Sequence, residues 1–246
     1  LNIKTMKKNI KTLGVLLLFI FTISTLSAQK LKSFNSSVTK KVGPKKIAIP
    51  YTDVVSYLGY ANLGSEDEIK DGKKFYYIYI WIPIIAPEIG VRMISPAVTV
   101  KSKNITESKD YIENKDSSDY FDTYITLERS DIFLKDDISA ESVANASWYT
   151  LARNDDSSEM PKNPGGRSYN SLLRYESDIN DPLSALSVGL YRIGFTTYKT
   201  GEVSGTFLAQ VGSPIKLPGV GIAKTIEELE VQINEWNKLH NLILTK

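Results

Sequence analysis

The alternation of apolar and polar positions predicts β-strands over most of the chain. Residues 74–83 are the densest in β-branched and aromatic side chains, which is typical of a strand. A period of two divides them into one face with Phe75, Tyr77, Tyr79 and Trp81 and another with Tyr76, Ile78, Ile80 and Ile82. Because both faces are apolar, we expect the strand to be covered on both sides, with Ile78, Tyr79, Ile80 and Trp81 mostly buried.

Shorter strands are predicted on either side of this segment, separated by loops rich in glycine, proline and charged residues. These strands cover residues 47–49, 54–60, 91–100, 120–129 and 169–176, and the loops cover residues 64–72, 101–119 and 152–168. The strand over 120–129 alternates, which indicates that one face is buried. Residues 188–198 and 203–211 flank the loop 199–202, whose Gly201 suits a positive φ, and they predict a hairpin.

Two helices are predicted. A short one covers residues 136–147, with Asp136 or Ser139 as its N-cap. The second covers residues 225–245, where Thr225 and Glu228 have the spacing of a capping box. Its apolar positions recur at helical spacing and are Ile226, Leu229, Ile233, Trp236, Leu239 and Ile243. We expect this stripe to pack on the domain, with a coiled-coil or partner-binding helix as the alternative.

The N-terminal region has the composition of an export signal. Met6 is the expected start, and three lysines precede an apolar stretch over residues 13–23 that is too short to span a bilayer. Small residues end this segment, so we expect a signal peptide over residues 1–28 with cleavage after Ala28, and a membrane anchor as the alternative. Residues 29–45 are polar and are predicted to be a flexible lead-in, followed by a single domain over residues 46–246.

Charge and composition exclude several chemistries. The net charge is +2, but four lysines and no acids lie in residues 1–28, so the rest has 26 basic and 28 acidic residues, a net of −2. This balance gives no indication of a nucleic-acid or anionic-membrane partner. The absence of cysteine excludes disulfides, thiol catalysis and Cys/His zinc sites, and it predicts a chain without a lipid anchor. His240 is the single histidine and is expected to be a structural or surface residue.

Carboxylates leave two kinds of site open. Paired carboxylates can hydrolyse glycosides, and the aromatic face of residues 75–81 could stack on sugar rings, although core packing is the expected role of that face. The second kind is a calcium site, because calcium binds six to eight oxygens. Two segments are rich in oxygen ligands, residues 116–123 and 154–159, and neither has the spacing of an EF-hand loop.

Several blocks of the sequence carry a resemblance to a known family. They are residues 74–96, Phe121-Asp122-Thr123, residues 169–172, and residues 189–198 with 201–203. Over residues 47–235 the chain resembles the leptospiral major surface lipoprotein family. The resemblance implies a mainly β fold, a jelly-roll-like antiparallel β-sandwich with peripheral helices and a C-terminal amphipathic helix. It also implies a bound calcium ion.

The resemblance also implies the ligands of that ion. They are Asp122, Thr123, Asp155, Asp156 and Tyr169, and we expect their oxygens within roughly 6–7 Å of a common point. Tyr169 is expected to offer its carbonyl rather than its phenol. The acidic loop has fewer consecutive aspartates than the family has, which predicts weaker binding.

These observations predict an exported, calcium-binding β-sandwich protein without catalysis, secreted or located in the envelope of a bacterium. The resemblance implies an adhesion role with extracellular-matrix or other surface proteins as partners. Two alternatives remain open, a carbohydrate-binding module or glycoside hydrolase, and a structural envelope protein that assembles through its C-terminal helix.

Overall fold

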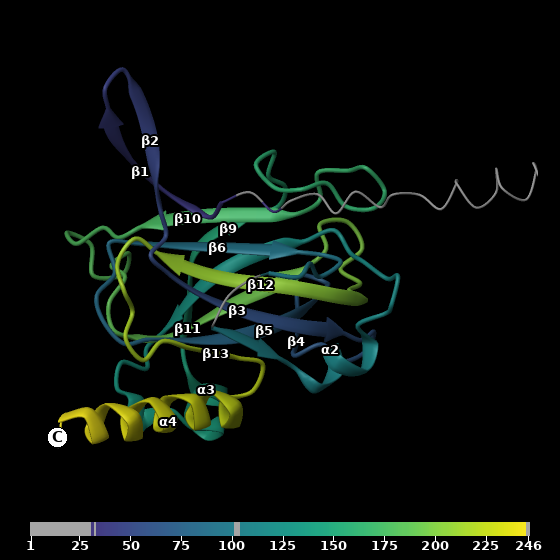
Figure 1. Ribbon diagram of the computed structural model, residues 1–246. Helices are drawn as coiled ribbons and strands as arrows, with labels where there is room; N and C mark the ends of the chain where they lie inside the picture. Colours follow the sequence, from purple (N-terminus) through teal and green to yellow (C-terminus); the bar gives the residue numbers. More distant parts are fainter. Residues whose placement is uncertain (1–30, 32, 101–103, 245–246) are drawn as a thin grey trace, which may run out of the picture. The chain divides into compact units, whose positions relative to one another are not determined.

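The computed structural model describes residues 31, 33–100 and 104–244, with side chains up to residue 240. The predicted signal peptide over residues 1–28 lies outside this range. The described residues from Leu31 onward belong to one compact unit. Two mainly antiparallel sheets form a sandwich-like arrangement with helices at its periphery (Figure 1), so the predicted fold class is confirmed.

The strands are divided between two large sheets and one separate hairpin. The five-stranded sheet has the order β10 (Ser171–Glu176), β6 (Glu88–Ile94), β12 (Gly205–Ser213), β3 (Asp53–Ala61) and β7 (Ile105–Glu107). The six-stranded sheet has the order β13 (Gly221–Ala223), β5 (Lys73–Ile82), β11 (Gly189–Thr196), β8 (Tyr124–Ser130) and β9 (Trp148–Asn154), and β4 (Glu68–Lys70) also pairs with β5. All pairs are antiparallel except β3 with β7. β1 (Asn35–Val42) and β2 (Lys45–Pro50) pair only with each other.

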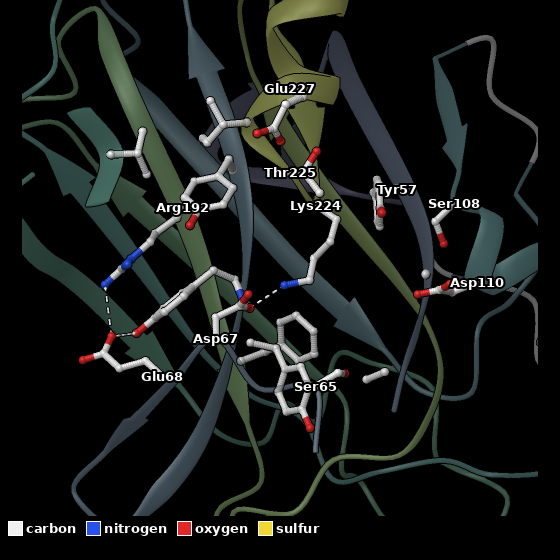
Figure 2. Close-up of a pocket in the computed structure, with 18 of the residues that line it drawn as sticks. Tyr57, Ser65, Asp67, Glu68, Ser108, Asp110, Arg192, Lys224, Thr225 and Glu227 are labelled. Atoms are coloured by element: carbon white, nitrogen blue, oxygen red, sulfur yellow. Dashed lines mark hydrogen bonds and ion pairs between the residues drawn. The ribbon is translucent and has the colours of Figure 1, made fainter. Parts of the chain in front are cut away.

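The helices cover edges and outer faces of the sheets. They are α2 (Lys109–Asn114), the 3₁₀ turn η1 (Lys135–Asp137), α3 (Ala140–Asn145) and α4 (Ile226–Leu244). None of the helices in the described residues is both long and apolar enough to cross a membrane. A pocket of about 810 Å³ opens where β3 and β5 approach α2, α3 and the start of α4 (Figure 2).

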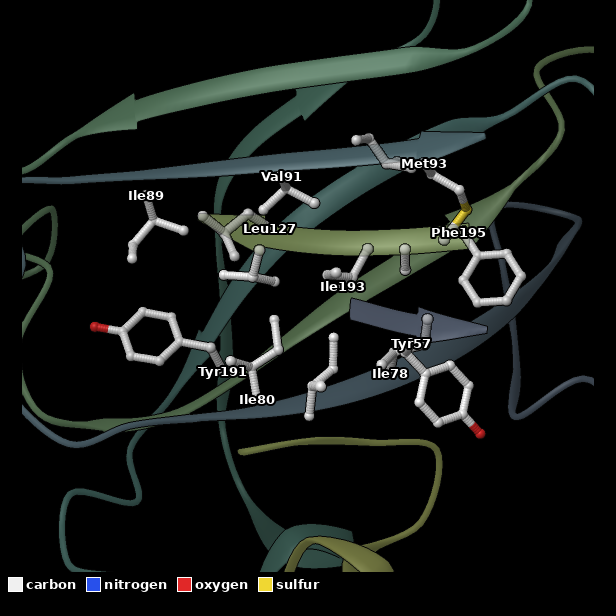
Figure 3. Close-up of a cluster of buried hydrophobic side chains, with 14 of the residues drawn as sticks. Tyr57, Ile78, Ile80, Ile89, Val91, Met93, Leu127, Tyr191, Ile193 and Phe195 are labelled. Atoms are coloured by element: carbon white, nitrogen blue, oxygen red, sulfur yellow. The ribbon is translucent and has the colours of Figure 1, made fainter. Parts of the chain in front are cut away.

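The main core lies between the two sheets. It covers one of the two apolar faces of β5. Figure 3 shows Ile78 and Ile80 of β5 among apolar side chains from both sheets, including Val91 and Leu127. Trp81 points to the other side, where it joins a second cluster with Leu190 and residues of α4. Ile78, Ile80 and Trp81 are buried as predicted, whereas Tyr79 is only partly buried.

Helix α4 begins and packs as its sequence predicts over its first three turns. The Thr225 hydroxyl accepts a hydrogen bond from the Glu228 N–H at 3.2 Å, which satisfies one of the free N–H groups of the first turn. Ile226, Leu229 and Ile233 are buried against the six-stranded sheet. Trp236 is half-buried and its ring lies against Gly219. The stripe ends as a packing surface before Leu239, which is 62% exposed.

The predicted hairpin over residues 188–211 is wrong. β11 lies between β5 and β8 in one sheet, and β12 lies between β3 and β6 in the other. The connecting segment therefore crosses from sheet to sheet instead of forming a turn between paired strands. Every residue of both strands is buried, and a strand of this kind needs a neighbour on each side and a covering layer on each face.

Other differences concern short elements in segments predicted as loops. The expected flexible lead-in contains β1, whose pairing with β2 orders residues from Asn35 onward. β4, β7 and α2 lie in predicted loops, and β9 was missed because Trp148–Asn154 has little apolar alternation. Of the two N-caps predicted for the short helix, Ser139 is the one observed, and the helix covers Ala140–Asn145.

Candidate metal centre

Strand pairing brings the predicted acidic ligands together. Asp122 lies two residues before the start of β8, and Asp155 immediately follows the end of β9. These strands are antiparallel neighbours with Ile125 opposite Asn154, so the beginning of one meets the end of the other. One carboxylate oxygen from each of Asp122, Asp155 and Asp156 lies within 4.8 Å of the other two.

Two oxygens of this cluster lack a hydrogen-bond partner. Asp122 Oδ1 and Asp155 Oδ1 are buried and accept no hydrogen bond. A buried carboxylate oxygen without a partner is costly, unless a cation or a proton compensates for its charge. The arrangement of donors therefore fits a hard cation, which prefers carboxylate oxygens as ligands.

The three carboxylates of the cluster lie close together, and their negative charges repel one another. Burial, followed by the charges of Asp155 and Asp156, raises the pKa of Asp122 to about 6. Burial also raises the pKa of Asp155, with a further contribution from Asp156, and it raises the pKa of Asp156 itself. A cation would remove the mutual repulsion, so the site favours a positive ligand over three bare carboxylates.

Thr123 and Tyr169 lie next to the aspartate cluster and are hydrogen-bonded to each other. The Tyr169 carbonyl accepts the Thr123 N–H at 2.9 Å and the Thr123 hydroxyl at 3.2 Å. The Thr123 carbonyl in turn accepts a hydrogen bond from the Ser171 hydroxyl. These bonds join the segment before β8 to the segment before β10 in the other sheet, so both residues hold the two sides of the site in position.

Residues not included in the predicted ligand set also belong to this region. Asn154 Oδ1 is a third buried oxygen without a hydrogen-bond partner, and Asn154 directly precedes the two aspartates of the loop. The Ser157 N–H donates to the Asn170 carbonyl at 3.1 Å, which fixes the acidic loop to the segment before β10. The position of Asn154 was visible in the sequence, whereas the contact of Ser157 with Asn170 depends on the fold.

Comparison with known proteins assigns the chain to a family. Residues 45–222 match the profile of the Lipl32 family, described as surface lipoproteins of the Spirochaetales order. The chain belongs to this family. No curated protein matches the chain. Membership of the surface lipoprotein family supports an exported protein at the outer surface or in the envelope.

In this surface lipoprotein homologue, the pocket beside β3 and β5 is the second candidate site. Figure 2 shows two ion pairs that cross it, Lys224 with Asp67 and Arg192 with Glu68. The Arg192 guanidinium lies 3.6 Å from the centre of the Tyr77 ring and 4.1 Å from that of Trp148. The charges of the pocket are therefore paired to a large extent, and the face of Tyr77 is already occupied.

This pocket differs from the groove that a carbohydrate site would require. The aromatic face of β5 was expected to form an open platform in that case, but Tyr77 is only 2% exposed and Trp81 packs under α4. His240 is exposed and stacks on Trp236, with ring centres 4.8 Å apart. The carboxylate cluster is thus the better candidate site, because its buried oxygens lack hydrogen-bond partners, and a ligand could take their place.

Proposed function

We propose that this spirochaete surface protein binds calcium through Asp122, Asp155 and Asp156. The observation that supports the proposal is the pair of buried, unpartnered carboxylate oxygens on Asp122 and Asp155. Three carboxylates within 4.8 Å of one another supply enough negative charge to bind a dication. The Thr123 carbonyl accepts one hydrogen bond, retains a second lone pair and is a proposed additional ligand. The Tyr169 carbonyl is the other, and it would release the Thr123 hydroxyl to bind the ion.

Calcium suits such a site better than magnesium does. The acidic ligands come from segments outside regular strands, before β8 and after β9, and loops of this kind allow irregular coordination. Calcium tolerates irregular coordination with six to eight oxygens, whereas magnesium requires near-ideal octahedral geometry. With only two consecutive aspartates in the loop, we expect a dissociation constant on the order of 10⁻⁵–10⁻³ M.

Calorimetric titration with calcium tests the proposal directly. The wild type is expected to bind one calcium ion, and Asp122→Asn is expected to weaken binding at least tenfold, because one of three carboxylates loses its charge. Asp116→Asn is the matched control, since Asp116 is an exposed aspartate in the turn after α2, and it should leave the affinity unchanged. Equal affinity in all three proteins would refute this ligand set.

We further propose a non-catalytic role in adhesion to extracellular-matrix proteins. The location of the family at the spirochaete surface supports this role, because a surface protein is exposed to host matrix. Binding of the protein to immobilised collagen and fibronectin, measured with calcium and with chelator, tests it. Saturable binding supports adhesion, and the absence of binding to both would favour a structural role in the envelope.

A further inference from the structure

The β1–β2 hairpin concentrates positive charge in a part of the chain without acids. Residues 33–52 contain four lysines, Lys40, Lys41, Lys45 and Lys46, and no Asp or Glu. All four side chains are exposed. The net charge of the whole chain does not reveal these lysines, because acidic residues elsewhere offset their charge. Figure 1 shows β1 and β2 extending away from the two large sheets.

The register of the hairpin places like charges opposite each other. Lys41 lies directly opposite Lys46, and like charges at opposed positions destabilise a strand pair. None of the ion pairs formed within the part of the chain that the structure describes involves the four lysines. The hairpin therefore lacks an internal counter-charge, and an external anion would stabilise it.

Apolar side chains share the end of the hairpin with the lysines. Val42 lies opposite Lys45, and Ile47 lies opposite Lys40. Val42 is 53% exposed and Ile47 is 51% exposed. Because side chains alternate between the two faces of a strand, Lys40 and Lys45 leave from one face and Lys41 and Lys46 from the other. The lysines thus surround an apolar tip closed by the turn at Gly43, whose φ is +60°.

The base of the hairpin is fixed to the sandwich. The Phe34 and Tyr51 rings meet edge to face with centres 4.6 Å apart. The buried Glu88 carboxylate accepts the Ser36 hydroxyl and the Ser37 N–H, both at 3.1 Å, and a further hydrogen bond from the Tyr51 hydroxyl. These contacts fix the base of the hairpin to the sandwich. They therefore also fix the direction in which the tip points.

We infer that the β1–β2 hairpin docks end-on onto an anionic lipid surface. The lysines contact headgroup phosphates, and Val42 and Ile47 enter the interfacial layer. A lipid surface offers both negative charge and an apolar layer, whereas nucleic acid or an acidic polysaccharide offers only the charge. This inference is independent of the calcium site, which no residue of the hairpin forms.

Vesicle co-sedimentation tests the inference on residues 29–246, which include every described residue of the compact unit. At about 0.1 M salt the protein is expected to bind vesicles of phosphatidylcholine with about 30% phosphatidylglycerol, and to bind pure phosphatidylcholine vesicles far less. Replacing Lys40, Lys41, Lys45 and Lys46 with Gln should lower the partition coefficient roughly 100-fold or more, since each lysine near an anionic surface contributes about 1 kcal/mol.

A matched variant controls for net charge. Lys115, Lys135, Lys216 and Lys238 are exposed lysines outside the hairpin, and changing all four to Gln alters the total charge by the same amount. We expect this variant to bind vesicles within about twofold of the wild type, because its hairpin is intact. Equal losses in both variants would overturn the inference, as would equal binding to vesicles with and without the anionic lipid.

The apolar residues at the tip make it possible to distinguish binding to a lipid surface from binding to other anions. The double change Val42→Ser and Ile47→Ser should weaken vesicle binding at least about tenfold and leave retention on heparin unchanged. Inorganic phosphate should compete no better than chloride at the same ionic strength. Unchanged vesicle binding by this double variant, or specific displacement by phosphate, would contradict docking to lipid. Wild-type melting temperatures in the variants would show that their folds are intact.

Discussion

Asp122 is the residue whose ionisation controls the proposed site. Its ordinary pKa of 3.8 is raised to about 6 in the folded protein, mainly by burial. The folded state therefore holds this proton more tightly than the unfolded state does. The resulting contribution to stability is greatest at low pH and is lost as the pH rises through about 6. Calcium requires the ionised form and reverses this dependence.

A pH dependence of calcium binding follows from this pKa. We expect the affinity to fall roughly tenfold between pH 7 and pH 5, because Asp122 must lose its proton before it can bind the ion. Titrations at pH 5, 6 and 7 measure the change. An affinity that is constant over this range would mean that Asp122 is not a ligand.

Glu128 is the acceptor of a buried ion-pair network next to the pocket. It is 1% exposed and accepts hydrogen bonds from Arg192 Nε at 2.7 Å and from Lys70 Nζ at 3.3 Å. Glu128→Ala removes the carboxylate and leaves the buried Arg192 guanidinium without its closest partner. We expect a loss of about 3 kcal/mol in the free energy of unfolding, measured by urea titration.

The exposed Glu141 of α3 provides the control for Glu128. Glu141→Ala should change the free energy of unfolding by no more than about 0.5 kcal/mol. A similarly small effect for Glu128→Ala would show that the network contributes little to stability.

Individual elements were predictable where their residues carry a local signal. β5 was predicted closely because its β-branched and aromatic residues leave few alternatives to a strand, and α4 because Thr225 and its apolar spacing mark a helix start. The pairing of β11 and β12 was not predictable in the same way. Gly201 between them permits a turn, but their partners are fixed by burial against strands distant in the sequence.

Helix α4 is expected to stabilise the fold through its buried side. Leu229 is fully buried against the six-stranded sheet, so Leu229→Ala should lower the free energy of unfolding by about 3 kcal/mol. Leu239 belongs to the same helix and is 62% exposed, and Leu239→Ala should have an effect below about 0.5 kcal/mol. Equal effects in urea unfolding would contradict the packing of α4 described above.

At the scale of the whole molecule, the candidate site was predicted from a family resemblance and not from spacing alone. The resemblance named Asp122, Asp155 and Asp156 before their positions were known, and the pairing of β8 with β9 brings them together. The sequence could not indicate that Thr123 and Tyr169 would be hydrogen-bonded to each other, because 46 positions separate them. Such a contact depends on how the two sheets approach each other.

Calcium binding is expected to be coupled to folding. A ligand that binds only the folded state stabilises it by about 2.7 kcal/mol at a hundredfold excess over the dissociation constant. For a chain of this size, that corresponds to a rise of roughly 5–10 °C in melting temperature. Asp122 and the adjacent pair Asp155 and Asp156 come from two separate segments of the chain, so the unfolded state has no preformed site for the ion.

Thermal melting of residues 29–246 with chelator, with millimolar calcium or with millimolar magnesium tests this coupling most directly. We predict a clear rise with calcium, a smaller rise with magnesium, and no calcium-dependent rise when Asp122, Asp155 and Asp156 are all changed to Asn. The triple variant should melt no lower than the wild type in chelator, because burial and mutual repulsion outweigh the attraction of Lys73 and Lys199 for these carboxylates. Identical wild-type curves in chelator, calcium and magnesium would contradict the calcium site.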